Sequence, residues 1–432
     1  MPTMARHAKS RALSRFLMPV TVVLAVGLAA LLIAVWQPAG TEHPGPPAVQ
    51  EQPTQAPPTQ TATPPPPPPP DAVFTIMTGG DVLPHATVIR TALEDGTDGA
   101  YDFVPMLAAT QEWTSGADLA ICNMEVPLAP PGTSPSGYPV FGAPDELAHN
   151  LRELGWDGCS TATNHTLDRG MAGASHTLDV FDEVGLGHAG SARDAEEAET
   201  AQWYELEREG QRIRVANIAA TYGTNGIPLP EPWVVELIDA ERLIDQATRA
   251  REAGADLVVA SIHCCSEYRG QPDPEQVDLA QQLADSGVID LYVGHHAHVP
   301  QPIEKLSGGP DDEGMWVIYG LGNFISNQDE NCCVPQTATG LLATATVVKP
   351  HDEPARVREV EWTAVTVDRL GRQRLHVLAE LAAGDRPDGL TLSDERIASR
   401  YEGVREVVGS QATERTEPPT PTGEPAVVLD RQ

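Results

Sequence analysis

From residue 73 onward, short apolar segments with the character of β-strands alternate with amphipathic segments that have the spacing of α-helices. The predicted early strands cover 73–81, 117–127, 156–165, 212–223, 255–264 and 288–296, and the predicted helices cover 145–155, 171–185, 240–254 and 274–287. Such alternation is typical of α/β folds. The later predicted strands, 315–324, 340–348 and 357–367, have fewer helices between them and indicate layered sheets. The sequence therefore predicts a layered α/β sandwich.

Residues 16–36 are apolar and uncharged, and four basic residues but no acidic ones precede them. A run of about 20 apolar residues matches the thickness of a bilayer core. The charge bias places residues 1–15 in the cytoplasm as a basic segment and the rest of the chain outside. A cleaved signal peptide is the alternative, but Trp36 stands where a cleavage site needs small residues. We expect one N-terminal transmembrane helix in a single-pass protein of the cell membrane, with the catalytic domain extracellular.

Composition predicts the remaining boundaries. Residues 37–71 are rich in proline, with seven consecutive prolines at 64–70, which predicts an extended linker. The alternation of strands and helices predicts a domain over residues 72–350. The following segment, residues 351–409, is expected to add strands and a helix that complete this domain. Residues 410–432, rich in Pro, Thr and Glu, predict a disordered tail.

The chain is strongly acidic, with a formal net charge of −33 at pH 7. A field of this sign repels nucleic acid and anionic lipid headgroups. Nucleic acid is therefore excluded as a partner.

Polar side chains suited to metal binding end five of the six early predicted strands. They are Asp81, Asn123 with Glu125, Asn164 with His165, His263, and the cluster His295, His296 and His298. Active sites of α/β folds collect at the carboxyl ends of strands. Carboxylate, amide oxygen and imidazole together suit Mn²⁺, Zn²⁺ or Fe²⁺, and a carboxylate between two ions can bridge them. A chance cluster of histidines on a solvated turn is the alternative.

Six quoted segments carry a family resemblance. They are "TGGDVLPH", "NMEVPL", "TATNHTLDRG", "HCCSEY", "GHHAHVPQPIE" and "YGLGNF", in this order within residues 73–345. In these segments the chain resembles the CapA family of poly-γ-glutamate capsule synthesis proteins. That family is similar in fold to the calcineurin-like metallophosphoesterases. The resemblance implies a metallophosphoesterase-like sandwich and an anionic cell-envelope polymer or membrane synthase subunits as partners.

The resemblance also implies roles for particular residues. His165 would protonate a leaving group or orient the substrate, and His295 falls at a position that the pattern leaves free. Two divalent ions, Mn, Zn or Fe, are expected to be held by Asp81, Glu125 as the bridging carboxylate, Asn164, His263, His296 and His298.

The chain departs from the phosphoesterase pattern near its first motif. His85 lies four residues after Asp81, where that superfamily has a histidine only two residues on, so we expect His85 at the rim of the pocket. Glu267 and Asn323 are further candidates for binding substrate. Arg169 and Arg269 are candidates for offsetting the negative field near a polyanion.

The six cysteines include two adjacent pairs. Cys264 and Cys265 replace the usual Trp-Gly of the family, and the loop that precedes Cys332 and Cys333 should approach the same pocket. We hypothesise one or two disulfides between these pairs. Cys122 and Cys159 lie inside predicted strands, and we expect them to be buried thiols.

Three functions are compatible with these features. The first is an exported, membrane-anchored, metal-dependent hydrolase or transferase of capsule polymer synthesis. The second is a non-catalytic assembly or anchoring factor for a polymer synthase. The third is an extracellular metallophosphoesterase, which the missing Asp-x-His motif disfavours.

Overall fold

The computed structural model describes residue 45, residues 70–310 and residues 313–431. The predicted anchor at 16–36 lies outside these ranges, as do the basic segment before it and nearly all of the linker. Within the ranges described, no helix combines the length and the apolar character that a membrane crossing needs.

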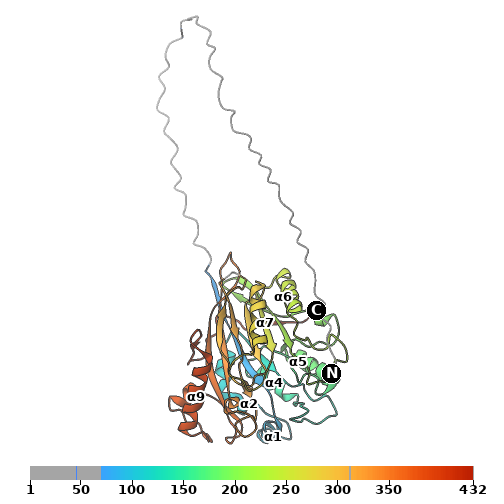
Figure 1. Ribbon diagram of the computed structural model, residues 1–432, viewed down its shortest axis with the longest axis vertical. Helices are drawn as coiled ribbons and strands as arrows, with labels where there is room; N and C mark the ends of the chain where they lie inside the picture. The colour runs from blue at the N-terminus through green and yellow to red at the C-terminus, as the bar shows by residue number, and fades with distance from the viewer. Residues whose placement is uncertain (1–44, 46–69, 311–312, 432) are drawn as a thin grey trace, which may run out of the picture. The chain divides into compact units, whose positions relative to one another are not determined.

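Two mixed β-sheets form the centre of the folded unit (Figure 1). The first has the strand order β14-β13-β12-β1-β2-β3-β4, with β11 beside β1 and β15 beside β13. Its strands are β1 (Ala72–Val82), β2 (Leu119–Met124), β3 (Gly158–Ser160), β4 (Gly187–Ala189), β11 (Asn323–Ile325), β12 (Thr339–Lys349), β13 (Arg356–Asp368), β14 (Arg374–Val377) and β15 (Thr413–Glu414). Strands β1 to β4 run parallel to their neighbours in that series, whereas β12, β13 and β14 pair antiparallel.

The second sheet has the order β16-β5-β6-β7-β8-β10-β9. Its strands are β5 (Gln202–Arg208), β6 (Gln211–Thr221), β7 (Leu257–His263), β8 (Leu291–His295), β9 (Ile303–Leu306), β10 (Met315–Ile318) and β16 (Val427–Leu429). Strands β6, β7, β8 and β10 are parallel. Each sheet thus contributes a run of parallel strands whose carboxyl ends can build one site.

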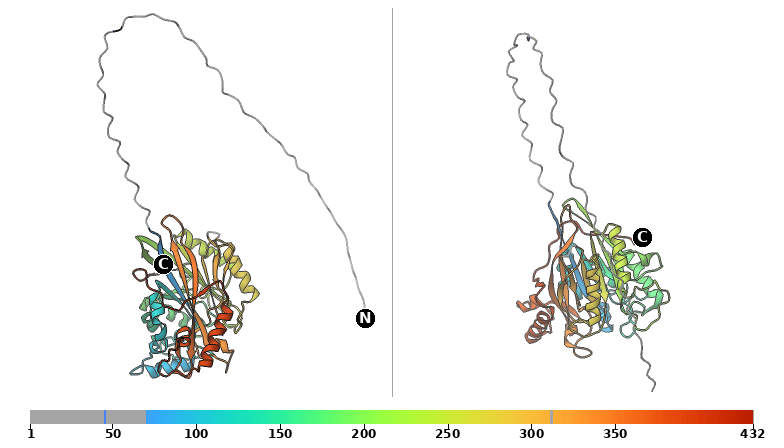
Figure 2. Two further views of the ribbon diagram at one scale, coloured as in Figure 1. Left: turned by 90° about the vertical axis from the view of Figure 1, so that its left-hand side faces the viewer. Right: turned by 45° about the horizontal axis from the view of Figure 1, so that its top comes forward.

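Most of the helices cover the outer faces of the two sheets, whereas the last two pack against the core between the sheets. The helices are α1 (Ala86–Asp95), α2 (Val104–Leu107), α3 (Gln111–Gly116), α4 (Glu146–Glu153), α5 (Gly170–Val184), α6 (Ala240–Glu252), α7 (Pro274–Asp285), α8 (Leu378–Ala382) and α9 (Asp394–Val408), with short 3₁₀ turns η1 (Ala108–Thr110), η2 (Glu197–Glu199) and η3 (Pro335–Ala338). Helices α1 to α5 pack on the first sheet and α6 and α7 on the second (Figure 2).

The main core lies between the sheets, where Phe74 and Ile121 of the first sheet meet Val259 and Leu291 of the second. These side chains are almost completely buried. Because each sheet is apolar on both faces, the stable arrangement is helix, sheet, sheet, helix. The predicted layered α/β sandwich is confirmed.

The prediction of a disordered tail over 410–432 is wrong for its described part, 410–431. Strand β15 pairs with β13, and β16 pairs with β5. Near the end, the half-buried Arg431 donates hydrogen bonds to the backbone carbonyls of Ser191 and Glu197 at 2.8 and 2.7 Å. These contacts are long-range and specific, and a composition rich in Pro, Thr and Glu gives no sign of them.

One buried carboxylate joins the tail to both sheets. Asp118 accepts hydrogen bonds from the backbone N–H of Thr75 in β1 at 2.8 Å and from that of Thr422 in the tail at 2.7 Å. Its Oδ1 also lies 2.8 Å from Nη2 of Arg208 in β5, and both of these side chains are at most 3% exposed. Removing one partner of such a buried ion pair leaves the other charge uncompensated.

We therefore expect Asp118→Ala to lower the free energy of unfolding by about 3–5 kcal/mol. Urea denaturation checks this, with Glu112→Ala as the control, because Glu112 is an exposed acid on the neighbouring helix α3. A loss no larger than that of the control would show that Asp118 does not hold the tail and the two sheets together.

Candidate metal centre

The polar residues that follow the strands converge where the two sheets meet. In the first sheet, Asp81 pairs with Asn123 of β2 and with Asn323 of β11. In the second, His263 and His295 are register partners at the ends of β7 and β8. Carboxyl ends of parallel strands from both sheets therefore supply the site, as the sequence pattern predicts.

Glycines allow the backbones to approach closely at this point. A Cβ atom on Gly80, directly before Asp81, would lie 2.1 Å from the carbonyl oxygen of Gly322. A Cβ atom on Gly294, directly before His295, would lie 1.9 Å from the carbonyl oxygen of Tyr319. Only glycine fits at such distances, so these two positions set how closely the ligand-bearing strand ends can gather.

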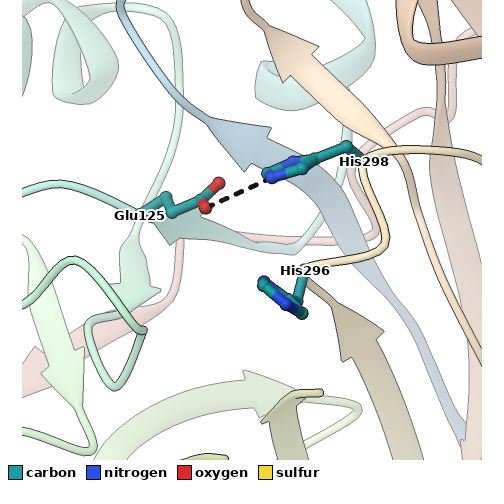
Figure 3. Close-up of side chains that lie close together, drawn as sticks. All are labelled: Glu125, His296 and His298. Carbon is teal, nitrogen blue, oxygen red and sulfur yellow. Dashed lines mark ion pairs between the residues drawn. The ribbon is translucent and has the colours of Figure 1, made fainter. Parts of the chain in front are cut away.

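Glu125, His296 and His298 form a candidate metal-binding group (Figure 3). One ligand atom from each lies within 4.8 Å of the others, and all three side chains are buried. The two histidines have φ angles of 82° and 58°, in the left-handed region. Such a backbone costs about 1–3 kcal/mol for each residue and is found mainly at functional sites. In Figure 3 both imidazoles face the Glu125 carboxylate from the loop after β8.

The remaining predicted ligands lie around this group. Asp81 Oδ2 is 3.1 Å from His298 Nδ1. His263 Nε2 is 2.9 Å from Asn164 Oδ1 and 3.7 Å from Glu125 Oε1. All six residues that the sequence predicts as metal ligands are thus brought together in one cluster.

His295, which the sequence pattern excludes as a ligand, borders the same cluster. Its Nδ1 atom lies 3.6 Å from Asp81 Oδ1. The ring is 3% exposed. The side chain therefore approaches the carboxylate of Asp81 rather than that of Glu125.

Burial and mutual charge shift the pKa values of these groups strongly. Burial raises the pKa of Glu125 well above its usual range, and the Asp81 charge adds to this rise. Burial opposes protonation of His298, yet Glu125 and Asp81 raise its pKa to about 9. Burial together with the His298 charge lowers the pKa of His296 to about 3. For His263, burial and His296 hold the pKa well below its ordinary value.

Several ligand atoms of the cluster have no hydrogen-bond partner among the described residues. They are both carboxylate oxygens of Glu125 and the Nδ1 atoms of His295 and His296. Buried charges are normally paired or coordinate metals. Carboxylate oxygens and imidazole nitrogens are ligands of Mn²⁺, Zn²⁺ and Fe²⁺, so the residues present fit a divalent ion.

A cavity of about 670 Å³ opens beside the cluster and is lined by His165, His85 and Glu267. Nδ1 of His165 lies 2.9 Å from Asp168 Oδ2, an oxygen that also accepts the Phe141 N–H at 2.8 Å. This contact fixes the orientation of the His165 ring at the cavity wall. The geometry suits His165 for moving a proton to or from a bound substrate.

The three predicted substrate-binding residues differ in position. His85 and Glu267 line the cavity, but Asn323 is not among its lining residues. Instead, Asn323 Oδ1 lies 3.1 Å from His298 Nδ1, and its Nδ2 donates to Gln328 Oε1 and the Thr337 carbonyl. Because its amide is engaged by the protein, Asn323 positions the His298 ring and makes no direct contact with the cavity.

The two arginines named from the sequence lie in different settings. Arg169 donates to the carbonyls of Phe141 and Ser134, each at 3.0 Å, and so holds the loop beside His165. Arg269 is exposed and lies 3.7 Å from Asp273. Neither lines the cavity.

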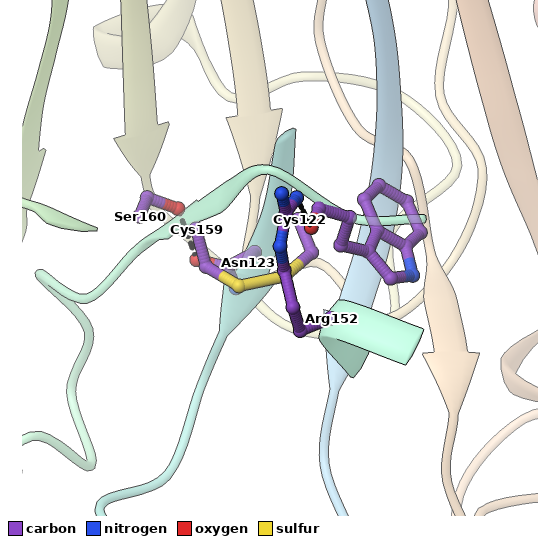
Figure 4. Close-up of a disulfide and its surroundings, with 6 residues drawn as sticks. Cys122, Asn123, Arg152, Cys159 and Ser160 are labelled. Carbon is purple, nitrogen blue, oxygen red and sulfur yellow. Dashed lines mark hydrogen bonds between the residues drawn. A yellow bond between two sulfur atoms is a disulfide. The ribbon is translucent and has the colours of Figure 1, made fainter. Parts of the chain in front are cut away.

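Cysteine pairing differs from the sequence-based expectations. Cys122 and Cys159 are register partners on β2 and β3 and form a disulfide (Figure 4). Cys264 and Cys265 are bonded to each other, while the adjacent pair Cys332 and Cys333 is free. The expected buried thiols and the expected disulfides between the two adjacent pairs are therefore wrong. The spacing of cysteines does not reveal strand register, which brings Cys122 and Cys159 together.

Residues that the sequence did not single out also shape the site. Asn225, with a φ of 52°, has its Nδ2 atom 3.4 Å from His165 Nδ1 and accepts a hydrogen bond from Asn164 at 3.2 Å. Gln328 and Arg369 line the cavity from other loops. Each of the three follows a predicted strand (212–223, 315–324 or 357–367) within four residues, so the strand-end signal was present, but none lies in the six motifs that carry the family resemblance.

Comparisons with known proteins agree with the resemblance seen in the motifs. The chain is 26% identical to the PGA biosynthesis protein CapA of Bacillus subtilis over 58% of this chain and 62% of that protein. It is 25% identical to a probable polyglutamine synthesis accessory protein of Mycobacterium tuberculosis, over 60% of this chain and 74% of that protein. The chain thus spans less than two thirds of the Bacillus relative's length.

Solved structures that resemble the chain include two nucleotidases. The NAD nucleotidase of Haemophilus influenzae matches with a TM-score of 0.43 and 11% identity, over 80% of this chain and 57% of that chain. The 5'-nucleotidase precursor of Thermus thermophilus matches with a TM-score of 0.41 and 14% identity, over 77% and 58%.

The sequence profile of a protein family matches residues 75–328, more than half of the chain. This range contains the convergent strand ends, the Glu125 and histidine cluster, and most of the residues that line the cavity beside them. The chain belongs to the bacterial capsule synthesis protein family PGA_cap.

Proposed function

We propose that this chain is an exported, membrane-anchored protein of capsule or cell-envelope polymer synthesis, of the poly-γ-glutamate type. In this proposal it is a metal-dependent hydrolase or transferase that acts on an anionic polymer beside membrane synthase subunits. The names of its relatives support the pathway: one is a PGA biosynthesis protein and another a probable polyglutamine synthesis accessory protein. The two disulfides support export, since disulfides persist in oxidising compartments.

One observation carries the catalytic part of the proposal. Glu125 Oε1 lies 3.6 Å from His298 Nε2 and 3.7 Å from His263 Nε2, so this carboxylate stands between two groups of ligands. Asp81 and His298 would hold one divalent ion, and Asn164, His263 and His296 the other. Glu125 would belong to both. Divalent ions held there would polarise an ester, phosphoanhydride or amide and lower the pKa of water.

The protein's own residues supply the remaining chemistry. Asp168 holds the His165 ring through Nδ1, which leaves Nε2 as the atom that can give a proton to a leaving group. Asn323 keeps His298 in place, and Ser160 holds Asn123, whose amide donates to Asp81 at 2.9 Å. The fixed ligands and the oriented His165 thus face one cavity.

Hydrolysis assays test this function. The protein is loaded with Mn²⁺, Zn²⁺ or Fe²⁺ and incubated with γ-glutamyl-p-nitroanilide and with bis(p-nitrophenyl) phosphate, with and without chelator. We expect metal-dependent release of p-nitroaniline or p-nitrophenol that the chelator stops. Metal-loaded protein that hydrolyses neither compound, nor a poly-γ-glutamate chain, would contradict catalysis and favour the assembly-factor alternative.

A further inference from the structure

Three cavities adjoin one another around the loop that joins β11 to η3, residues 326–334. The first is the cavity beside the metal centre, and the others have volumes of about 370 and 360 Å³. Arg369 lines the first and second, Arg400 the second and third, and Tyr268 the third and first. Because they share lining residues, the three hollows lie next to one another around the loop, and together they are called the groove.

The acidic residues of this loop already have basic partners. Arg369 forms an ion pair with Asp329, and Arg396 of α9 forms one with Glu330. The nearby Asp368 accepts hydrogen bonds from the backbone of Gly371 and from Thr391. These contacts fix the loop against α9 and β13 and leave two of the three arginines along the groove paired.

Arg400 differs from the other two arginines. Its Nη1 donates to Thr366 Oγ1 at 2.7 Å and to the Val367 carbonyl at 3.0 Å, which anchors α9 on β13. Over the described ranges it has no ion-pair partner, and its Nε and Nη2 atoms donate no hydrogen bond. The side chain is half-buried, and these two atoms are not sealed from solvent.

The available edge of Arg400 has the geometry of an anion-binding site. Nε and Nη2 of a guanidinium form a planar fork that matches the two oxygens of a carboxylate. Burial and the Arg396 charge lower the pKa of Arg400, but a guanidinium keeps its charge in proteins. The neighbouring acids Asp329 and Asp368 disfavour a doubly charged phosphate more than a singly charged carboxylate.

We propose that Arg400 is a carboxylate-binding subsite for an extended, carboxylate-bearing chain that lies in this groove and leads into the cavity of the metal centre. This inference rests on the proposed function for the position of the reacting bond, but the binding itself does not require catalysis. Arg400 selects the ligand at a distance from the metal ligands, and Arg369 lies between the two sites.

Binding of a defined probe tests the subsite. Fluorescein-labelled γ-linked decaglutamate is titrated into the full-length protein and followed by fluorescence anisotropy. The variants are Arg400→Gln, Arg400→Lys and, as the matched control, Arg358→Gln, which removes an exposed arginine on β13 outside the three cavities. We expect at least tenfold weaker binding for Arg400→Gln, an intermediate loss for Arg400→Lys, and a change within twofold for the control.

Thermal unfolding of each variant separates binding from folding. If Arg400→Gln does not fold, the affinity of Arg400→Lys tests the subsite, because lysine keeps the positive charge but lacks the planar fork of donors. Equal affinity of wild type and a folded Arg400 variant would overturn the inference. So would competition by a ten-unit polyphosphate that is stronger than competition by unlabelled decaglutamate.

Metal content and hydrolysis of a small substrate, measured on the same preparations, distinguish this inference from the proposed function. A small substrate reaches only the cavity of the metal centre. Wild-type protein that binds neither metal nor small substrate, but binds decaglutamate through Arg400, would refute the proposed function and retain the subsite. If the wild-type protein is active and its Arg400 variants bind decaglutamate as tightly as wild type, the subsite is refuted and the proposed function is retained.

Discussion

Replacing Glu125 by glutamine is expected to lower metal-dependent hydrolysis about a thousandfold, equivalent to about 4 kcal/mol of transition-state stabilisation. The carboxylate is fully buried, and its oxygens make no hydrogen bond within the described part of the chain. An amide of the same shape has no charge with which to hold a divalent ion. Initial rates at saturating metal, with metal content measured in parallel, check this expectation.

The same substitution should change stability in opposite directions with and without metal. In metal-free protein, Glu125→Gln removes a buried carboxylate whose oxygens accept no hydrogen bond within the described residues and whose nearest imidazole nitrogen is 3.6 Å away. The variant should therefore raise the free energy of unfolding by about 1–3 kcal/mol. In metal-loaded wild type the ion stabilises the fold, and the variant loses that contribution. Glu353→Gln, a change at an exposed acid, serves as the control. Unchanged activity together with a loss of stability in both states would show that Glu125 has only a structural role.

His165→Ala is expected to lower kcat by about a hundredfold to ten-thousandfold, the usual range for general acid–base catalysis. His165 lines the cavity, and within the described residues it makes no hydrogen bond or ion pair with Glu125, His296 or His298, so metal content should stay unchanged. Asp168→Asn should cause a smaller loss, because it removes the carboxylate that orients the ring. Rates across pH 5–9 check this, since loss of the acid should remove one limb of the profile.

The chain offers a matched control for the His165 experiment. His176 and Asp145 form a similar pair, with Nε2 and Oδ1 2.8 Å apart, and neither lines the cavity. His176→Ala should leave kcat within twofold of wild type. Equal losses in the two histidine variants would mean that the effect arises from general destabilisation and not from proton transfer.

The polar strand ends were predictable because side-chain type and strand periodicity are local properties of the sequence. Asp81, Glu125 and His263 each follow or end an apolar strand, and the fold brings these ends together. The layered α/β sandwich follows from the same alternation. Such features need no knowledge of which strand lies beside which.

The features that were missed depend on contacts between distant segments. Asn323 was expected at the cavity, but its pairing beside Asp81 turns its amide toward His298. Cys122 and Cys159 became a disulfide only because β2 and β3 lie in parallel register. Disorder of the tail was predicted from composition. Composition cannot show that Thr422 donates a hydrogen bond to Asp118, 304 residues away.

The backbone at the histidine cluster is a third case. The family resemblance picks out His296 and His298 as ligands, yet the left-handed φ angles that turn both rings toward Glu125 come from the tertiary structure. Local sequence preference would disfavour this conformation for histidine. The surrounding packing must therefore maintain the strain, as is common at functional sites.

Elemental analysis of protein purified without chelator tests the central claim most directly, with wild type compared with the His296→Ala/His298→Ala double variant. The account predicts about two divalent ions per chain in wild type and their loss in the double variant. Wild-type protein that holds no metal, even after Mn²⁺ or Zn²⁺ is added, would contradict it, as would a double variant that keeps the full metal content.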